Sequence, residues 1–234
     1  MKNMLTLVLT ATLAAGFTGF VSADDKAPSQ PAGVQNDAPV KGAKAQRRGP
    51  RAEKGAEKAA SGEAKVGEAA PNFTLKTTDG KEWSLSDAKG KVVVLEWVNP
   101  ECPVCVRVMK DGTVANTLKE CKAQFGDVVY VAINSSASRP ASLKATESYL
   151  KTNKIEIPAL LDEDGKVGKM YGARTTPHCY VIDANGVLVY QGAIDDAQDG
   201  DGKKNHVVNA VTALKKGEAV SPSSTRPYGC SVKY

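Results

Sequence analysis

The most informative part of this chain is Trp97-Val98-Asn99-Pro100-Glu101-Cys102-Pro103-Val104-Cys105, because it places two cysteines three residues apart shortly after the apolar run Val92–Leu95. Such an apolar run is typical of a buried strand. A helix that begins at Cys102 would bring both sulfurs to one face, since residues three apart are neighbours on a helix. The stretch therefore predicts a dithiol where a buried strand is followed by a helix.

The start of a helix makes Cys102 the candidate nucleophile. Unpaired N–H groups and the positive end of the helix dipole favour thiolate over thiol and so lower the pKa of the cysteine. Cys105, one turn further in and expected to be less exposed, is the candidate to attack a mixed disulfide between Cys102 and a substrate. Pro103 suits the first helical turn, where its missing N–H costs nothing.

Two other uses of a Cys-x-x-Cys pair stay open, namely a structural zinc site and an inert disulfide. Structural zinc needs a second cysteine pair or suitably spaced histidines, and the chain has only His178 and His206. The acidic run 195–202 lacks the closing glutamate of an EF-hand loop and is expected to be a solvated loop. The sequence thus predicts no metal site and no cofactor.

The order of the expected elements predicts an α/β fold with a mixed central sheet and helices on both faces. Asp111-Gly112 divides the helix that follows Cys102, Asn185-Gly186 is a hairpin signal, and Gly217 ends the last helix. The expected elements are a hairpin over 73–85, strands over 92–98, 128–133, 179–182 and 188–191, and helices from 102, over 140–151, over 167–171 and over 207–214.

Four segments, taken in order, resemble the opening of extracytoplasmic thioredoxin-like proteins of the redoxin (AhpC/TSA-related) group. They are Gly67–Leu75, Asp79–Lys81, Leu85–Asp87 and Gly90–Leu95. The resemblance covers about residues 66–216 and implies a thioredoxin fold with an N-terminal β-hairpin extension. The dithiol then falls where this family keeps its active site, and Thr176-Pro177 falls where it keeps a cis-proline.

The resemblance also implies roles for three residues outside the dithiol. Glu96 lies where thioredoxin-like proteins often carry a buried acid that exchanges protons with the deeper cysteine; exposure at a strand end is the alternative. Burial would raise its pKa by desolvation and let it act near neutral pH. Pro177 would pack against the dithiol, and Thr176 would offer its backbone to an extended substrate.

Three further cysteines bring the total to five, which leaves at least one thiol unpaired. Cys121, on an apolar helix face, and Cys179, in an apolar strand, are expected to be buried hydrophobes. Cys230 lies in a polar tail with little means of burying it, and redoxin proteins with a similar ending make it a candidate third redox thiol. His178 is expected to be a surface or packing histidine.

The ends of the chain predict an exported protein. Residues 1–23 have an early lysine, a weakly polar to apolar stretch and a Val21-Ser22-Ala23 ending, as in a secretory signal peptide cut before Asp24; an uncleaved anchor is the alternative. Residues 24–65 are rich in Ala, Pro, Gly and Lys, lack aromatic residues and should form a disordered linker. A redoxin domain over 66–216 and a tail over 217–234 follow. The expected location is the periplasm or the extracellular space.

Three functions compete on these grounds. The first is a thiol-disulfide oxidoreductase that exchanges disulfides with protein thiols and an unidentified redox partner. The second is a thiol peroxidase with Cys102 oxidised by peroxide and resolved by Cys105 or Cys230, although Leu95 and Asn99 stand where peroxiredoxins carry Pro and Thr or Ser. The third is a non-enzymatic metal-binding or interaction module. The net charge of +5 lies mainly in the linker, so no nucleic-acid partner and no membrane span after cleavage are expected.

Overall fold

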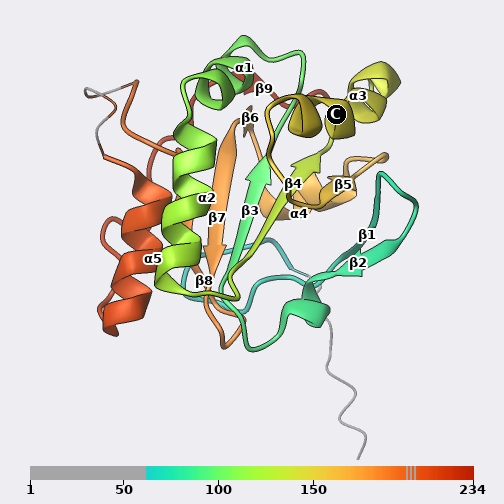
Figure 1. Cartoon of the computed structure of the whole chain (residues 1–234). Coiled ribbons are helices and arrows are strands. Elements are labelled where there is room, and N and C mark those ends of the chain that lie inside the picture. Colours follow the sequence, from blue (N-terminus) through green and yellow to red (C-terminus); the bar gives the residue numbers. More distant parts are fainter. Residues whose placement is uncertain (1–61, 199, 201, 203) are drawn as a thin grey trace, which may run out of the picture. The chain divides into compact units, whose positions relative to one another are not determined.

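Strand β3 (Val93–Trp97) lies in a seven-stranded sheet of order β2-β1-β5-β4-β3-β7-β8 in the computed structural model (Figure 1). It runs parallel to β4 (Val129–Asn134) and antiparallel to β7 (His178–Ile182). All five of its residues are buried, as expected of a strand covered on both faces. The remaining strands are β1 (Thr74–Thr77), β2 (Glu82–Ser84), β5 (Ala159–Leu161) and β8 (Leu188–Gly192).

The structure describes residues 62–198, 200, 202 and 204–234. The predicted signal peptide and nearly all of the predicted linker therefore lie outside the described residues. Contacts of the domain begin at Ala64, whose N–H donates to the Met170 carbonyl at 2.9 Å, slightly before the expected boundary at residue 66. Within the described part of the chain, no helix is both long and apolar enough to cross a lipid bilayer.

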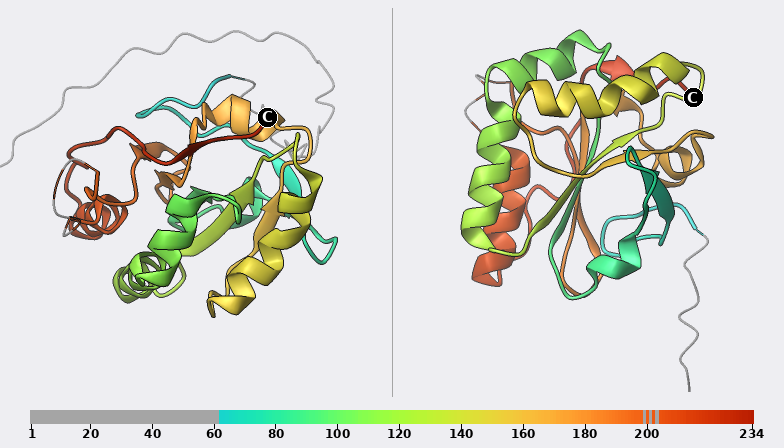
Figure 2. Two further views of the ribbon diagram at one scale, coloured as in Figure 1. Left: turned by 90° about the horizontal axis from the view of Figure 1, so that it is seen from above. Right: turned by 45° about the vertical axis from the view of Figure 1, so that its right-hand side comes forward.

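Helices cover both faces of the sheet, and Figure 2 shows α2 and α5 together on one side of it. That side holds a core to which the dithiol belongs, and the other side holds an aromatic core around Trp97, Tyr171 and Tyr180. The predicted thioredoxin fold with its N-terminal hairpin is confirmed. The helical elements are η1 (Leu85–Ala88), α1 (Pro103–Lys110), α2 (Thr113–Gln124), α3 (Pro140–Thr152), α4 (Lys166–Tyr171) and α5 (His206–Lys216).

Local sequence signals set the ends of several elements. Gly112 adopts a φ of 84° between α1 and α2, so the predicted break in the long helix is confirmed. Gly217 caps α5 with a φ of 70°, also as expected. Cys121 and Cys179 are fully buried, and His178 packs against the Tyr180 ring with centroids 4.6 Å apart, so these three predictions are confirmed.

Two expectations about the chain's later part are wrong. The acidic run 195–202 is not wholly solvated, because Asp195 is buried and its carboxylate accepts hydrogen bonds from the Tyr228 hydroxyl and the Ala197 N–H. The tail is not merely a polar extension, because it forms strand β9 (Cys230–Ser231), which pairs with β6 (Thr175–Thr176). Both differences arise because the tail folds back over the domain.

Candidate active site

The dithiol lies at the start of α1, after the turn that connects it to β3, and β6 and β9 lie at the same end of the sheet (Figure 1). Cys102 is the N-cap residue of α1 and Pro103 occupies the first turn. The Cys102 carbonyl accepts from the Val106 N–H at 2.9 Å, which begins the helix, and the Cys102 N–H donates to the Asn99 carbonyl at 3.0 Å. The predicted helix start at Cys102 is thereby confirmed.

Both thiols are covered, although only Cys105 was expected to be. Each residue is 1% exposed, because the loop that carries Thr176 and the tail that carries Cys230 close over Cys102. All five cysteines of the chain are free thiols in this structure. Any substrate that reacts with Cys102 must therefore first gain access to its sulfur.

The two thiols have pKa values displaced in opposite directions. A hydrogen bond from the Cys105 thiol, supported by Cys230, the Cys105 N–H and Thr176, lowers the pKa of Cys102 to about 4 against the opposing effect of burial. Burial, and then the negative charge on Cys102, raises the pKa of Cys105 well above its ordinary value. Near neutral pH the pair therefore consists of a Cys102 thiolate and a Cys105 thiol.

The cis-proline loop lies against the Cys102 sulfur. The Thr176–Pro177 peptide bond is cis, as the family resemblance implied. In its thiol form Cys102 donates from Sγ to the Thr176 carbonyl at 3.0 Å, a contact that is lost when the sulfur is ionised. The following residue, His178, is buried, and this burial lowers its pKa to about 3, which keeps its ring neutral.

Glu96 is buried on the same side of the sheet as the dithiol. The residue is 1% exposed and stands directly across from Cys179 in the β3–β7 pair. Burial raises the pKa of Glu96 to about 7, although the Tyr130 hydroxyl, which donates to Glu96 Oε2 at 2.7 Å, opposes this shift. The charge of Glu96 also contributes to the raised pKa of Cys105. The expected burial and the direction of the pKa shift are both confirmed.

Strand β9, near the C-terminus, pairs with β6, whose Thr176 backbone was predicted to bind an extended substrate. Thr176 pairs with Cys230 across β6 and β9, and the Val232 N–H donates to the Arg174 carbonyl at 3.1 Å. Cys230 is half-buried, so the expectation that the tail has little means of burying it is wrong. Backbone pairing, which the polar composition of the tail does not reveal, supplies the burial.

Two tyrosines near the dithiol were missed by sequence reasoning. Tyr130 holds the Glu96 carboxyl, and Tyr149 donates its hydroxyl to the Cys105 carbonyl at 2.8 Å. Tyr130 lies in a strand that was expected, but its contact with Glu96 depends on the side-by-side placement of β3 and β4. Tyr149 reaches the site from α3, and no local pattern points to that contact.

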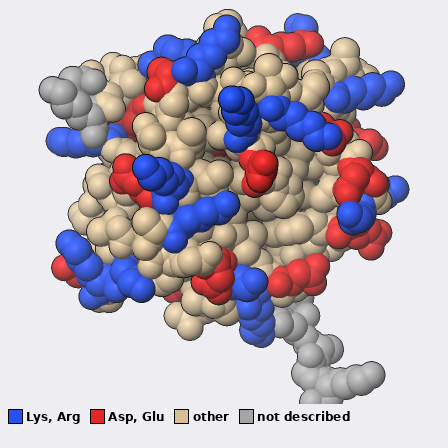
Figure 3. All heavy atoms as spheres, viewed as in Figure 1, with Lys and Arg blue, Asp and Glu red and all other residues tan. Residues whose placement is uncertain are grey.

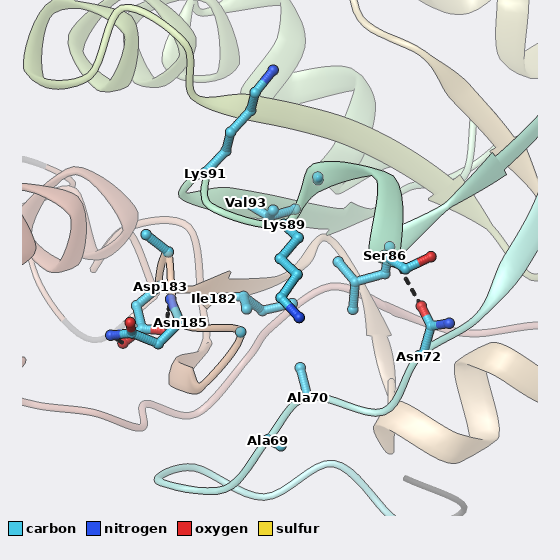
Figure 4. Close-up of a pocket in the computed structure, with 14 residues that line it drawn as sticks. Ala69, Ala70, Asn72, Ser86, Lys89, Lys91, Val93, Ile182, Asp183 and Asn185 are labelled. Atoms are coloured by element: carbon cyan, nitrogen blue, oxygen red, sulfur yellow. Dashed lines mark hydrogen bonds between the residues drawn. The ribbon is translucent and has the colours of Figure 1, made fainter. Parts of the chain in front are cut away.

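Two pockets of the described domain have no cysteine among their lining residues. One of about 330 Å³ opens at the amino end of β3, where Asn72, Ser86, Asp183 and Asn185 line it (Figure 4). Another of about 580 Å³ lies between the hairpin and α3. In the described residues, no group of three or more His, Cys, Asp or Glu side chains is arranged to hold a metal ion. The dithiol itself is covered, because Cys102 and Cys105 are each 1% exposed.

Comparison with known proteins places this geometry in a family. The model of the AhpC/TSA family matches residues 66–191, more than half of the chain. The chain belongs to the AhpC/TSA family. A solved structure of a hypothetical protein from Sinorhizobium meliloti 1021 is similar to it, with a TM-score of 0.63, 27% identity and coverage of 73% of this chain and 94% of the other.

Two similar curated proteins have names that describe redox proteins. The chain is 32% identical over 123 residues to the thiol-disulfide oxidoreductase ResA of Bacillus subtilis (strain 168), which covers 53% of this chain and 64% of ResA. It is 32% identical over 137 residues to chloroplastic peroxiredoxin Q of Oryza sativa subsp. japonica, covering 55% and 59%. The predicted class, a thioredoxin-like oxidoreductase, is confirmed at this level. The match spans less than two thirds of either relative.

The raised pKa of Glu96 predicts how stability depends on pH. Because burial lifts this pKa from its ordinary value of 4.5 to about 7, the folded state favours protonated Glu96, and the resulting stabilisation is lost as pH rises through that interval. The wild type should therefore lose stability between about pH 5 and pH 8, whereas Glu96→Gln has no such group to ionise. We expect the free energy of unfolding of Glu96→Gln, relative to that of the wild type, to increase by about 2–3 kcal/mol over this range.

Urea unfolding of the reduced protein measures this difference. Glu82→Gln is the matched control, because Glu82 is an exposed strand residue, and its difference from the wild type should stay constant with pH. A constant difference for Glu96→Gln as well would show that Glu96 ionises in the folded state as it does in the unfolded one.

Proposed function

We propose that this protein is an exported thiol-disulfide oxidoreductase that uses Cys102 and Cys105 to exchange disulfides with protein substrates. The observation that carries the proposal is the placement of two free thiols in the first turn of α1, with the cis-proline loop against Cys102; the opposite displacement of the two pKa values agrees with it. The cysteine with the lowered pKa, Cys102, is the nucleophile, and Cys105 is the resolving thiol. The kinship with ResA supports the same activity.

The reaction follows from that division. The Cys102 thiolate attacks one sulfur of a substrate disulfide, forms a mixed disulfide and releases the first substrate sulfur as a thiolate. Cys105 then loses its proton and attacks Cys102 Sγ, which breaks the mixed disulfide and releases the second substrate sulfur. The substrate gains two electrons and the enzyme is left with a Cys102–Cys105 disulfide; the reverse sequence oxidises a substrate dithiol.

Glu96 serves in this scheme as the proton relay for Cys105. Burial gives its carboxyl a pKa of about 7, so that it can accept the Cys105 proton during reduction and return it during oxidation. A fully exposed carboxyl would be too weak a base for a thiol whose pKa is raised. The hydrogen bond from Tyr130 holds the carboxyl in one orientation.

Thr176 and Pro177 form the substrate-binding edge in this proposal. The Thr176 carbonyl accepts a hydrogen bond from the thiol form of Cys102, so a segment paired with β6 would bring its own sulfur close to the Cys102 sulfur. Basic and acidic side chains are intermixed on the face shown in Figure 3. Recognition through backbone pairing and sulfur chemistry fits such a surface better than recognition through charge.

Export is part of the proposal and rests on the sequence of residues 1–23. Their pattern is that of a secretory signal, and a mature protein in the periplasm or outside the cell would meet substrates with disulfides. No step of the mechanism depends on this location.

A thiol peroxidase is the second candidate, favoured by the similarity to peroxiredoxin Q and by a third thiol beside Cys102. In that reaction Cys102 would take an oxygen atom from peroxide, and the resulting sulfenic acid would condense with a neighbouring thiol and release water. Asn99 stands at the position of the peroxiredoxin Thr or Ser, and its amide is occupied by Ser136 and Ser142. The oxidoreductase therefore remains the better-supported function.

Removal of each thiol should have a different effect on turnover. We expect Cys102→Ser to abolish reduction of a disulfide-bonded peptide, whereas Cys105→Ser should accumulate a mixed disulfide between Cys102 and that peptide. Both changes are made in a chain that carries Cys230→Ser, so that no third thiol competes. Mass spectrometry of the quenched reaction identifies the adduct.

The matched control for these variants is Cys121→Ser in the same background. Cys121 is fully buried in α2, and its removal should leave turnover unchanged. Retained turnover in Cys102→Ser, or an adduct on Cys105 in place of Cys102, would contradict the assignment of the nucleophile.

The relay role of Glu96 predicts a pH profile. The rate at which the second substrate thiol is released should rise with pH through about 7 in the wild type. In Glu96→Gln this inflection should disappear and the rate near neutral pH should fall, on the order of 10²-fold. Single-turnover kinetics across pH measure both.

Tyr130→Phe separates the relay from a structural role. The Tyr130 hydroxyl lowers the pKa of Glu96 through its hydrogen bond, so its loss should move the inflection to higher pH while the rate limit at high pH is kept. An unchanged profile in Glu96→Gln would exclude the relay.

A further inference from the structure

The last residues of the chain run directly across the dithiol. Strand β9 pairs antiparallel with β6, with Thr175 opposite Ser231 and Thr176 opposite Cys230. The Thr176 hydroxyl donates to the Cys230 carbonyl at 3.4 Å. The same Thr176 residue contacts the Cys102 sulfur through its own carbonyl. The tail thus occupies the backbone position proposed above for a substrate.

Contacts on both sides fix this strand in place. Ahead of it, the Tyr228 hydroxyl donates to the buried Asp195 carboxylate, and the Arg107 guanidinium lies over the Tyr228 ring at 5.8 Å. After it, the Lys233 carbonyl accepts from the N–H of Ser138 at 3.1 Å and from its hydroxyl at 3.0 Å. The Tyr234 hydroxyl also donates to the Ala173 carbonyl at 2.6 Å. The strand is held by several independent contacts.

A glycine permits the close approach of the tail to the cis-proline loop. Gly229 has a φ of 122°, and a Cβ at this position would lie 2.2 Å from the Thr176 carbonyl oxygen and 3.3 Å from Pro177 Cδ. A side chain there would push the tail away from β6. The next residue, Cys230, is therefore brought over the dithiol by a backbone path that only glycine allows.

The Cys230 sulfur faces the nucleophile. Cys230 is paired with Thr176, whose carbonyl lies 3.0 Å from Cys102 Sγ, and the interaction of the two thiols contributes to the displaced pKa of both cysteines. A substrate sulfur in a mixed disulfide with Cys102 would have to lie in contact with the Cys102 sulfur at this same open end of the helix. Cys230 is thus placed as a substrate sulfur would be.

We propose that Cys230 is a third redox-active residue, held by β9 as an internal substrate that exchanges disulfides with Cys102. This inference rests on the proposed function, because it requires the Cys102–Cys105 couple. In the oxidised enzyme, the Cys230 thiolate attacks Cys102 Sγ, the Cys102–Cys230 bond forms and the Cys102–Cys105 bond breaks. Cys105 leaves with the electron pair and takes up the proton that Cys230 gave up, so no net electrons are transferred.

The proposal defines the external substrate more closely. An extended protein segment can pair with β6 only after β9 has left it, so the substrate competes with the tail for the same backbone groups. The tail in turn shields the Cys102 sulfur, which is 1% exposed, from reagents that cannot displace it. Selectivity then favours segments that offer both a strand and a sulfur at the position of Cys230.

Disulfide mapping of Cys105→Ser tests the exchange. The whole chain is treated with oxidised glutathione, digested without reduction and analysed by mass spectrometry. We expect Cys102 to be linked to Cys230, with an intact mass lower by two hydrogens, because Cys230 displaces glutathione from the first adduct. A stable glutathione adduct on Cys102 beside an alkylatable Cys230 would overturn the proposal.

Control variants distinguish a folding defect from a true loss of the exchange between Cys230 and Cys102. Cys105→Ser with Cys121→Ser should keep the internal disulfide, and Cys105→Ser with Cys230→Ser should keep the glutathione adduct. Gly229→Ala should slow the internal linkage about tenfold or more, whereas Gly217→Ala, also at positive φ but with open space at Cβ, should not. An equal rate in both glycine variants would contradict the role of the close approach.

The wild-type chain in the same buffer tests the parent function separately. If it forms the Cys102–Cys105 disulfide while Cys105→Ser fails to link Cys230, only the third-thiol proposal is wrong. If Cys102 forms no disulfide in either chain, the proposed oxidoreductase function is wrong as well.

Discussion

Hydrogen bonding from the Cys105 thiol and the Cys105 N–H lowers the pKa of Cys102, and this effect depends on α1 beginning at Pro103, a short turn after β3 ends at Trp97. A shift of the helix start by one residue would move both donors away from the sulfur. The aromatic core behind β3 and the helices in front of it hold that junction in place. Much of the sheet can thus be understood as support for one stabilised thiolate.

Burial raises the pKa of every acidic group named at this junction. Glu96 and Cys105 therefore favour their protonated forms. At Cys102 hydrogen bonding outweighs the effect of burial, and the pKa falls. Glu96 and Cys105 lie on one side of the sheet, and the proton relay proposed for Glu96 rests on this arrangement. The C-terminal strand lies over the same region, where Cys230 pairs with Thr176.

Local sequence signals predict the parts of the fold that depend on neighbours in the chain. The spacing of Cys102 and Cys105, the Asp111-Gly112 break and the Gly217 cap all belong to this group. Strand β5 was missed because three residues are too short for a periodic pattern, and the β6–β9 pair was missed because its partners are 54 residues apart. The same limit hid the Tyr130 contact with Glu96, which depends on which strands lie side by side.

Whether Cys102 and Cys105 form one redox couple can be measured by a redox titration of the wild-type chain, with alkylation and mass mapping of every cysteine. We expect a Cys102–Cys105 disulfide to form and disappear as a single two-electron transition, with Cys121 and Cys179 reduced throughout. Oxidation of Cys102 and Cys105 at separate potentials, with no disulfide between them, would contradict it.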